Sequence, residues 1–321
     1  MKEEPTRGRS FRVVPERPFS LALTAERFAR FPDLVDLFDG RCYRRLLPVR
    51  PAALLAVSQE GNASRAVLNV RLEGPGADRP LACVLALRLL DRTLGVRSDF
   101  AAFEKAFRKD PLIGTAVRRF RGVRVAGAPT VWESLVLAVL AQQIHLAFAA
   151  SIRRELVLAF GRRARIGGDL FFDFPTARRI AAAGETGLEG FRLSGGKRGT
   201  LLRLAAEFNL GRVTEQALER LPDEEVVARL TSIRGVGRWT AEVALLRGLK
   251  RPDAFPAGDL SIVKNLAIGV LGRAGPSNER EMREISKRWQ PHRSLALVTM
   301  YAAMGGRRAK GGARKERASR A

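Results

Sequence analysis

The sequence predicts an α+β protein in which a small mixed domain built on an antiparallel sheet precedes a helical core. Residues 66–74, AVLNVRLEG, alternate apolar and polar side chains, as a half-buried strand does. The Gly61-Asn62 pair just before them indicates a hairpin turn. From about residue 100 the strand signal fades, and segment 99–111 carries three phenylalanines at helical spacing.

Composition shifts divide the chain of 321 residues into four segments. We expect a basic flexible arm (1–18), a mixed α/β domain (19–100), a helical core (101–306) and a basic disordered tail (307–321). Within the core, the apolar stretch 130–161 predicts two helices joined near Gln142, Gln143 and His145. Further helical patterns with short loops follow and end near residue 305, without the fixed period of a repeat protein.

The charge of the chain points to a polyanionic partner. Lys and Arg number 57 and Asp and Glu 33, a net charge of +24. The tail holds seven bases and one acid, hence +6, so the rest of the chain still carries 24 − 6 = +18. A basic folded body favours nucleic acid. A ribosomal partner or an anionic membrane surface would explain the charge as well.

Other classes of protein fit the composition less well. No uninterrupted apolar run reaches the length of a membrane span, and the start MKEEPTRGRS lacks the apolar region of a signal peptide. We therefore expect a cytoplasmic protein. Two cysteines and two histidines without a C-x-x-C pattern make an iron–sulfur cluster or a zinc site unexpected.

Residues 231–246, TSIRGVGRWTAEVALL, predict two helices joined by a tight hairpin at 233–238. Gly235 and Gly237 allow positive φ and a close approach of the backbone to a partner. The free N–H groups and the dipole at the start of the second helix favour a phosphate group. Such a seat recognises the nucleic-acid backbone rather than its sequence. A simple tight turn between two packed helices is the alternative.

Asp259 follows this hairpin in the stretch DAFPAGDLSIVKNL, residues 253–266. Its place before an apolar-periodic run predicts a helix N-cap. Backbone N–H groups and the helix dipole keep such a carboxylate ionised. A fixed negative charge at the edge of a cleft could stabilise a positive charge that develops in a reaction.

The two stretches together resemble the helix-hairpin-helix DNA glycosylase superfamily. The motifs RWTA, FPAGDL and RWQPHRSLA are similar to those of its 3-methyladenine DNA glycosylase II branch, and the resemblance extends back to the N-terminal domain. It implies a core of two helical subdomains and a monomer that binds double-stranded DNA, flips a damaged base out and hydrolyses its N-glycosidic bond. The expected substrates are alkylated purines such as 3-methyladenine and 7-methylguanine. The resemblance also implies that no cofactor is required.

The resemblance also implies roles for individual residues. Asp259 matches the catalytic aspartate. The base pocket is expected to contain Trp239, Tyr301 and Val243, where Val243 departs from an aromatic residue of the family. Gln143 and Ile144 fall at the DNA wedge. Phosphate binding is expected at Gly235, Val236, Gly237, Arg238 and Thr240. The main-chain carbonyls of Thr231, Ile233 and Val236 are candidates for a structural Na⁺ or K⁺.

Two alternatives stay open on the sequence. A glycosylase-lyase for oxidised bases would need a nucleophilic lysine at the position of Trp239. A non-catalytic helix-hairpin-helix protein would bind DNA without any need for Asp259.

Overall fold

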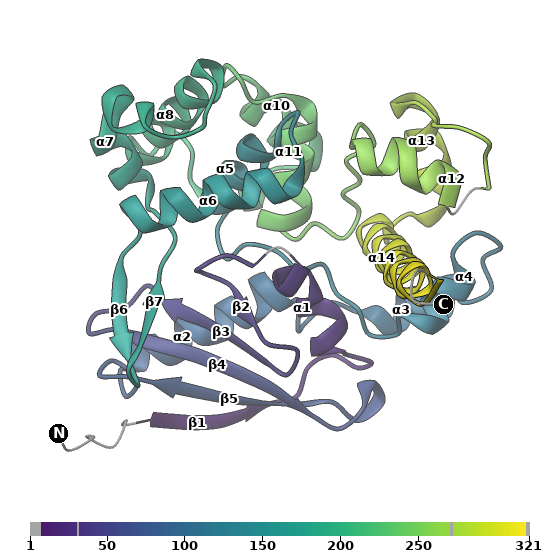
Figure 1. Cartoon of the computed structure of the whole chain (residues 1–321), viewed down its shortest axis with the longest axis horizontal. Coiled ribbons are helices and arrows are strands. Elements are labelled where there is room, and N and C mark those ends of the chain that lie inside the picture. Colours follow the sequence, from purple (N-terminus) through teal and green to yellow (C-terminus); the bar gives the residue numbers. More distant parts are fainter. Residues whose placement is uncertain (1–7, 31, 270–271, 319–321) are drawn as a thin grey trace.

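The computed structural model describes residues 8–30, 32–269 and 272–318. A five-stranded antiparallel sheet lies on one side of the molecule and helices cover the other (Figure 1). The strands follow the spatial order β1-β5-β4-β3-β2. Their bounds are β1 (Gly8–Val13), β2 (Leu37–Phe38), β3 (Cys42–Leu47), β4 (Ala53–Glu60) and β5 (Val67–Glu73). This arrangement confirms the predicted α+β class.

The predicted strand is β5, which lies between β1 and β4, and the predicted turn comes just before it. β5 pairs with β4 in a register that places Leu72 opposite Leu55, and both side chains are buried. Gly61 has a φ of +76° at the turn between the two strands, and the Asn62 side chain caps a short 3₁₀ turn after it. Helices α1 (Leu21–Arg30) and α2 (Pro80–Leu89) contribute to the same buried cluster.

The prediction of a flexible arm over residues 1–18 is wrong for residues 8–13. They form β1, which pairs with β5 from Gly8 opposite Glu73 to Val13 opposite Leu68. The open edge of β5 supplies the partner for these backbone groups, an effect that the charged local sequence does not reveal. The remaining arm residues 1–7 lie outside the described residues.

The helices of the core form two groups (Figure 1). One contains α5 (Val131–Ala141), α6 (Leu146–Phe160), α7 (Ala177–Glu189), α8 (Gly195–Asn209), α9 (Glu215–Arg220), α10 (Asp223–Thr231) and α11 (Arg238–Val243). The other contains α3 (Phe100–Phe107), α4 (Gly114–Arg119), α12 (Ala267–Gly269), α13 (Glu279–Ser286) and α14 (Arg293–Ala318). These groups correspond to the two predicted helical subdomains, and α5 and α6 meet at the predicted junction.

A β-hairpin within the first helical group was not predicted. β6 (Arg163–Ile166) and β7 (Asp169–Phe172) pair across a turn of two glycines with positive φ. The hairpin reaches from the helices to the sheet (Figure 1), where Ile166 and Phe171 pack with Leu46 and Leu54. Strands of four residues give too little alternation to be seen among helical patterns, and their packing against the sheet stabilises them.

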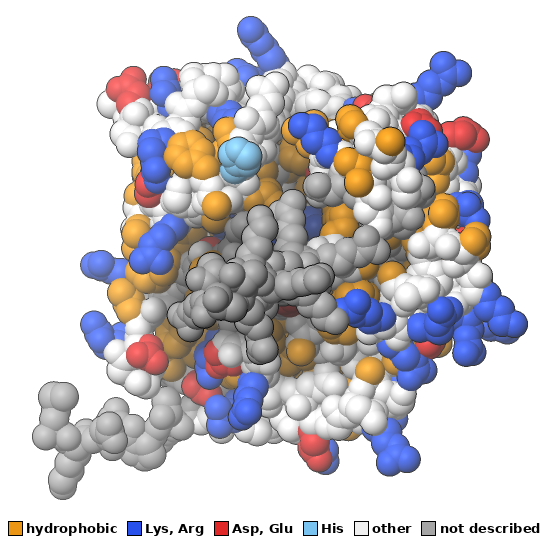
Figure 2. Space-filling view, turned by 45° about the vertical axis from the view of Figure 1, so that its right-hand side comes forward, with side chains coloured by type: hydrophobic (Ala, Val, Ile, Leu, Met, Phe, Trp, Pro, Cys, Tyr) orange, Lys and Arg blue, Asp and Glu red, His pale blue; other side chains and the backbone are white. Residues whose placement is uncertain are grey.

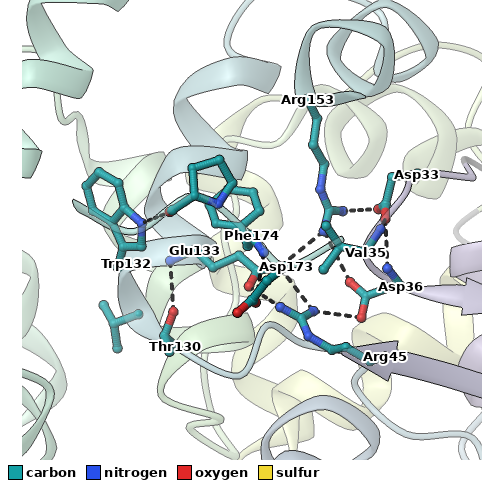
Figure 3. Close-up of polar contacts among 12 residues, drawn as sticks. Asp33, Val35, Asp36, Arg45, Thr130, Trp132, Glu133, Arg153, Asp173 and Phe174 are labelled. Atoms are coloured by element: carbon teal, nitrogen blue, oxygen red, sulfur yellow. Dashed lines mark hydrogen bonds and ion pairs between the residues drawn. The ribbon is translucent and has the colours of Figure 1, made fainter. Parts of the chain in front are cut away.

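A buried ion-pair network joins the sheet domain to the helices (Figure 3). Arg45 of β3 binds both oxygens of Glu133 of α5, at 2.5 and 3.2 Å, and Asp36 at 2.7 Å. Arg153 of α6 binds Asp36 and Glu133, each at 3.1 Å, and pairs with Asp33. Burial raises the pKa of Glu133, although Arg45 and Arg153 oppose the shift. The network fixes the N-terminal domain against the core.

Helix α14 continues to Ala318, whereas the sequence predicted disorder from residue 307. Arg, Lys and Ala dominate the segment, and all three have high helix propensity despite the glycines between them. The last three tail residues lie outside the described residues. Across the described ranges, no helix is long and apolar enough to span a membrane.

Candidate active site

The hairpin between α10 and α11 depends on Gly235. Its φ is +96°, a conformation that disfavours any residue with a side chain. A Cβ at this position would also lie 1.9 Å from the Thr200 hydroxyl oxygen on α8. The turn therefore needs glycine for its backbone conformation and for its packing against α8.

The first turn of α11 leaves backbone N–H groups available. Gly237 is its N-cap residue and no side chain caps the helix, so the first N–H groups have no partner within the helix. The two side chains expected to bind phosphate here already have partners. Arg238 pairs with Glu224 at 2.7 Å and with Glu242 at 3.0 Å, and the buried Thr240 hydroxyl accepts a hydrogen bond from Gln142. Phosphate binding at this turn would therefore rest on main-chain N–H groups.

The junction of α5 and α6 is tied to this hairpin. The Gln142 side-chain amide donates to the Gly235 carbonyl at 3.1 Å and to the Thr240 hydroxyl at 3.0 Å. Gln143 comes next with a φ of +55° and an exposed side chain. Ile144 is half-buried and packs against the helical core. Of the two expected wedge residues, Gln143 is thus the one that faces solvent.

Three of the predicted site residues meet at the Asp259 carboxylate. One oxygen accepts the Ser261 N–H at 2.8 Å, which confirms Asp259 as an N-cap. The other accepts the Trp239 indole N–H at 3.0 Å, and Tyr301 also hydrogen-bonds to this carboxylate. Burial and the negative charge of Asp259 raise the pKa of Tyr301. The hydroxyl therefore stays protonated and can donate its hydrogen bond.

These contacts span the two helical groups. Trp239 belongs to α11 in the first group, whereas Asp259 and Tyr301 belong to the second. Val243 lies four residues after Trp239 and therefore on the same face of its helix, and its side chain is half-buried. The arrangement places a fixed carboxylate, an indole and a phenol at the boundary between the two subdomains.

Two arginines that interact electrostatically with Tyr301 were missed by the sequence analysis. Arg247, on the π-helical turn η3 (Ala244–Gly248), donates to the Ala126 carbonyl at 2.5 Å and acts electrostatically on Asp259 and Tyr301. Arg27 of α1 acts electrostatically on Arg247 and Tyr301. Desolvation and the charge of Arg247 lower the pKa of Arg27, although its side chain keeps contact with solvent. No motif marks Arg27, because it lies in the N-terminal domain.

Two lysines lie in the segments that follow the hairpin, but neither occupies the position of Trp239, where a lyase would need its amine. Lys250 donates to the Val125 carbonyl, and desolvation lowers the pKa of its amine to about 7. Lys264 is exposed on the π-helical turn η4 (Ile262–Leu266). At the hairpin itself, the position where a lyase would need its amine carries the indole of Trp239.

Comparison with known proteins agrees with this geometry. The pattern of the HhH-GPD superfamily of base excision DNA repair proteins matches residues 136–291. The DNA-3-methyladenine glycosylase of Bacillus subtilis is 32% identical over 204 residues, which are 64% of this chain and 67% of that protein. DNA-3-methyladenine glycosylase 2 of Escherichia coli is 27% identical over 184 residues, 57% of this chain and 61% of that protein.

A solved structure extends the likeness to nearly the whole chain. The 3-methyladenine DNA glycosylase of Archaeoglobus fulgidus superimposes with a TM-score of 0.77 at 25% identity, covering 92% of this chain and 98% of that one. The chain belongs to the HhH-GPD superfamily of base excision DNA repair proteins. Within it, the chain falls in the branch of the 3-methyladenine DNA glycosylases.

Proposed function

We propose that this chain is a monofunctional DNA glycosylase that excises alkylated purines from double-stranded DNA in base excision repair. The observation that carries the proposal is the Asp259 carboxylate, held by Trp239, Tyr301 and the Ser261 N–H beside the hairpin. The names of the relatives support the same activity. We further propose that the enzyme acts as a monomer, in the cytoplasm at the nucleoid.

The reaction needs the base outside the helical stack, since the enzyme must reach the sugar C1′. The main-chain N–H groups at Gly237 and the start of α11 would hold a phosphate beside the lesion. Gln143, exposed at the neighbouring junction, would fill the gap that the flipped base leaves. Because the Gln142 side chain bonds to the Gly235 carbonyl, the wedge would be tied directly to the turn that holds the phosphate.

Asp259 would then stabilise the positive charge on the sugar as the bond from C1′ to the base breaks. The electron pair of that bond leaves with the base, and a water oxygen bonds to C1′ while its proton is released. An alkylated purine that already carries positive charge leaves easily, so little acid catalysis is needed. Trp239 presents a large flat surface on which a flipped purine can stack, while its N–H orients the carboxylate.

A charge-only substitution tests the role of Asp259. Asp259→Asn keeps the size of the side chain and removes its charge, and base release should fall by at least about 100-fold. Binding to lesion DNA should persist. Asp253→Asn is the matched control: Asp253 pairs with Arg293 at 2.8 Å, and its loss should leave the rate of release close to that of wild type. Release of 7-methylguanine at a near-normal rate by Asp259→Asn would refute the assignment.

Trapping with borohydride tests whether water is the only nucleophile. A lyase forms a Schiff base between an amine and C1′, which borohydride reduces to a stable adduct. With Trp239 at the hairpin, we expect an abasic site in an intact strand and no covalent adduct. Efficient trapping, or strand cleavage without added alkali, would favour the lyase instead.

We also propose a monovalent cation on the carbonyls of Thr231, Ile233 and Val236. The Ile233 carbonyl accepts the Val236 N–H at 2.9 Å and keeps a second lone pair for an ion. DNA affinity that differs between Na⁺ or K⁺ and a bulky organic cation at equal ionic strength would support this site. Equal affinity in both would refute it.

A further inference from the structure

Arg283 of α13 connects the two helical groups through an ion pair with Glu242 of α11. Many Lys and Arg side chains extend from the surface into solvent (Figure 2), as expected of a chain with a net charge of +24. The Arg283 guanidinium binds two carboxylates instead, with one nitrogen 2.9 Å from Glu242 and the other 2.7 Å from Glu279. Since Glu242 belongs to the first group and Glu279 to the second, Arg283 bridges the boundary between them.

Glu242 is a buried carboxylate that depends on its arginine partners. Its side chain is only 5% exposed, and one of its oxygens lies 3.0 Å from Arg238 and 2.9 Å from Arg283. The other oxygen is buried and has no hydrogen-bond partner among the described residues. A buried carboxylate is costly when its partners are removed. The ion pair with Arg283 therefore constrains how far α11 and α13 can move apart.

The same cluster of side chains reaches the segment that carries Asp259. Glu279 packs on Gly258, the residue before Asp259, because a Cβ added at Gly258 would lie 2.8 Å from one of its carboxylate oxygens. On α11, Trp239 precedes Glu242 by three residues, so the two side chains lie on the same face of the helix. Trp239 donates to Asp259 at 3.0 Å. The segment of Asp259 is thus connected to α11 in two places.

These contacts form a closed ring of six residues around the proposed catalytic carboxylate. The ring contains Trp239, Asp259, Gly258, Glu279, Arg283 and Glu242. Its α11 side begins at Gly237, where the main-chain N–H groups form the proposed phosphate seat. The ring therefore sets the distance between that seat and Asp259. A displacement of about 1 Å between a reacting group and its substrate can slow a reaction about 100-fold.

We propose that Arg283 and Glu242 are positioning residues, which hold Asp259 at the distance from the phosphate seat that excision of the base requires. The inference rests on the proposed glycosylase function and adds two residues that touch neither the base nor the sugar. They act through the relative placement of α11 and α13, so their loss should slow the chemical step and leave DNA binding intact.

The test measures single-turnover release of 7-methylguanine from methylated DNA at saturating enzyme. Arg283→Met should lower the rate constant by about 10- to 100-fold, while its Kd for DNA with an abasic-site analogue stays that of wild type. Glu242→Gln, which keeps the size of the side chain and removes its charge, should also lower the rate constant and leave the Kd unchanged. Arg283→Lys keeps a positive charge that can pair with Glu242 and should recover part of the lost rate.

Arg288→Met is the matched control, because it makes the same change just after α13 and breaks an ion pair with Asp110, at 3.3 Å, that lies within the second group. Its rate constant should equal that of wild type. The rate constant at saturating enzyme does not depend on the folded fraction, so a purely structural role of Arg283 would lower thermal stability without slowing release.

Three results would overturn the proposal. The first is an Arg283→Met rate constant within about twofold of wild type, and the second is an equal loss in Arg283→Met and Arg288→Met. The third is an undiminished effect of Arg283→Met in the Asp259→Asn background, since a residue that acts through Asp259 has little to add once its charge is gone. A wild type that releases no 7-methylguanine would instead refute the proposed glycosylase function itself.

Discussion

Replacing Trp239 with phenylalanine should slow base release, because it removes the indole N–H that holds one oxygen of Asp259 at 3.0 Å. The phenyl ring keeps most of the flat surface on which a flipped base could stack. The substitution therefore separates two roles of the same side chain, orienting the carboxylate and contacting the base.

The magnitude follows from the kind of hydrogen bond that is lost. A hydrogen bond to a charged group contributes about 1.5–3 kcal/mol, and each 1.36 kcal/mol corresponds to about a tenfold change in rate. The full range is therefore about 10- to 150-fold. Asp259 is half-buried, so water can replace part of the lost bond. The Ser261 N–H and Tyr301 also still hold the carboxylate. We expect a value near the lower end, about tenfold.

The assay is single-turnover release of 7-methylguanine from methylated DNA at saturating enzyme, so that weaker binding does not contribute. Trp132→Phe is the matched control, since the buried indole of Trp132 donates to the Pro175 carbonyl at 2.8 Å, away from the site. That variant should lose stability and keep its rate of release. Trp239→Leu, which also removes the aromatic surface, should be slower than Trp239→Phe.

A double-mutant cycle gives the sharpest refutation. If the indole acts through Asp259, Trp239→Phe should have little further effect in the Asp259→Asn background. A Trp239→Phe enzyme within about twofold of wild type would show that the hydrogen bond does not position the carboxylate. Full additivity of the two substitutions would show that Trp239 acts independently of Asp259.

Three further outcomes are expected. Arg45→Met should lower the free energy of unfolding, measured in urea, by about 3–5 kcal/mol because it leaves buried carboxylates unpaired. Arg12→Met is the control: it breaks an exposed ion pair with Glu60 and should lower the free energy of unfolding by less than about 1 kcal/mol. Burial lowers the pKa of Lys250 to about 7, below its ordinary value, so the folded protein binds fewer protons than the unfolded chain between pH 7 and 10. The free energy of unfolding of wild type, measured relative to Lys250→Met, should therefore rise by up to about 4 kcal/mol as the pH rises from 7 toward 10. An equal difference between the two proteins at both pH values would contradict this. Deleting residues 307–321 should flatten the dependence of log affinity on log salt by about 0.9 per lost phosphate contact, and an unchanged slope would show that the tail does not touch DNA.

Much of the candidate site could be predicted from the sequence because its signals are local. Gly235 of the hairpin and the N-cap pattern at Asp259 each require a particular backbone conformation at a particular residue, whereas Gly237, with a φ of −87°, does not adopt the positive φ expected for it. The polar residues near Gln142 interrupt an apolar stretch and so marked the junction of α5 and α6, which is also a local signal. The structure confirms these elements and brings Trp239 and Tyr301 to the same carboxylate. The roles of these residues in catalysis stay predictions.

What the sequence by itself determined is therefore the class of fold, the order of the helices and the position of the hairpin and of Asp259. Only the tertiary structure decided the strand β1, the β6–β7 hairpin and the ion pairs of Arg45. These features depend on contacts between residues far apart in the chain. Local patterns cannot report such contacts, because a charged or short segment looks the same whether or not a distant partner meets it.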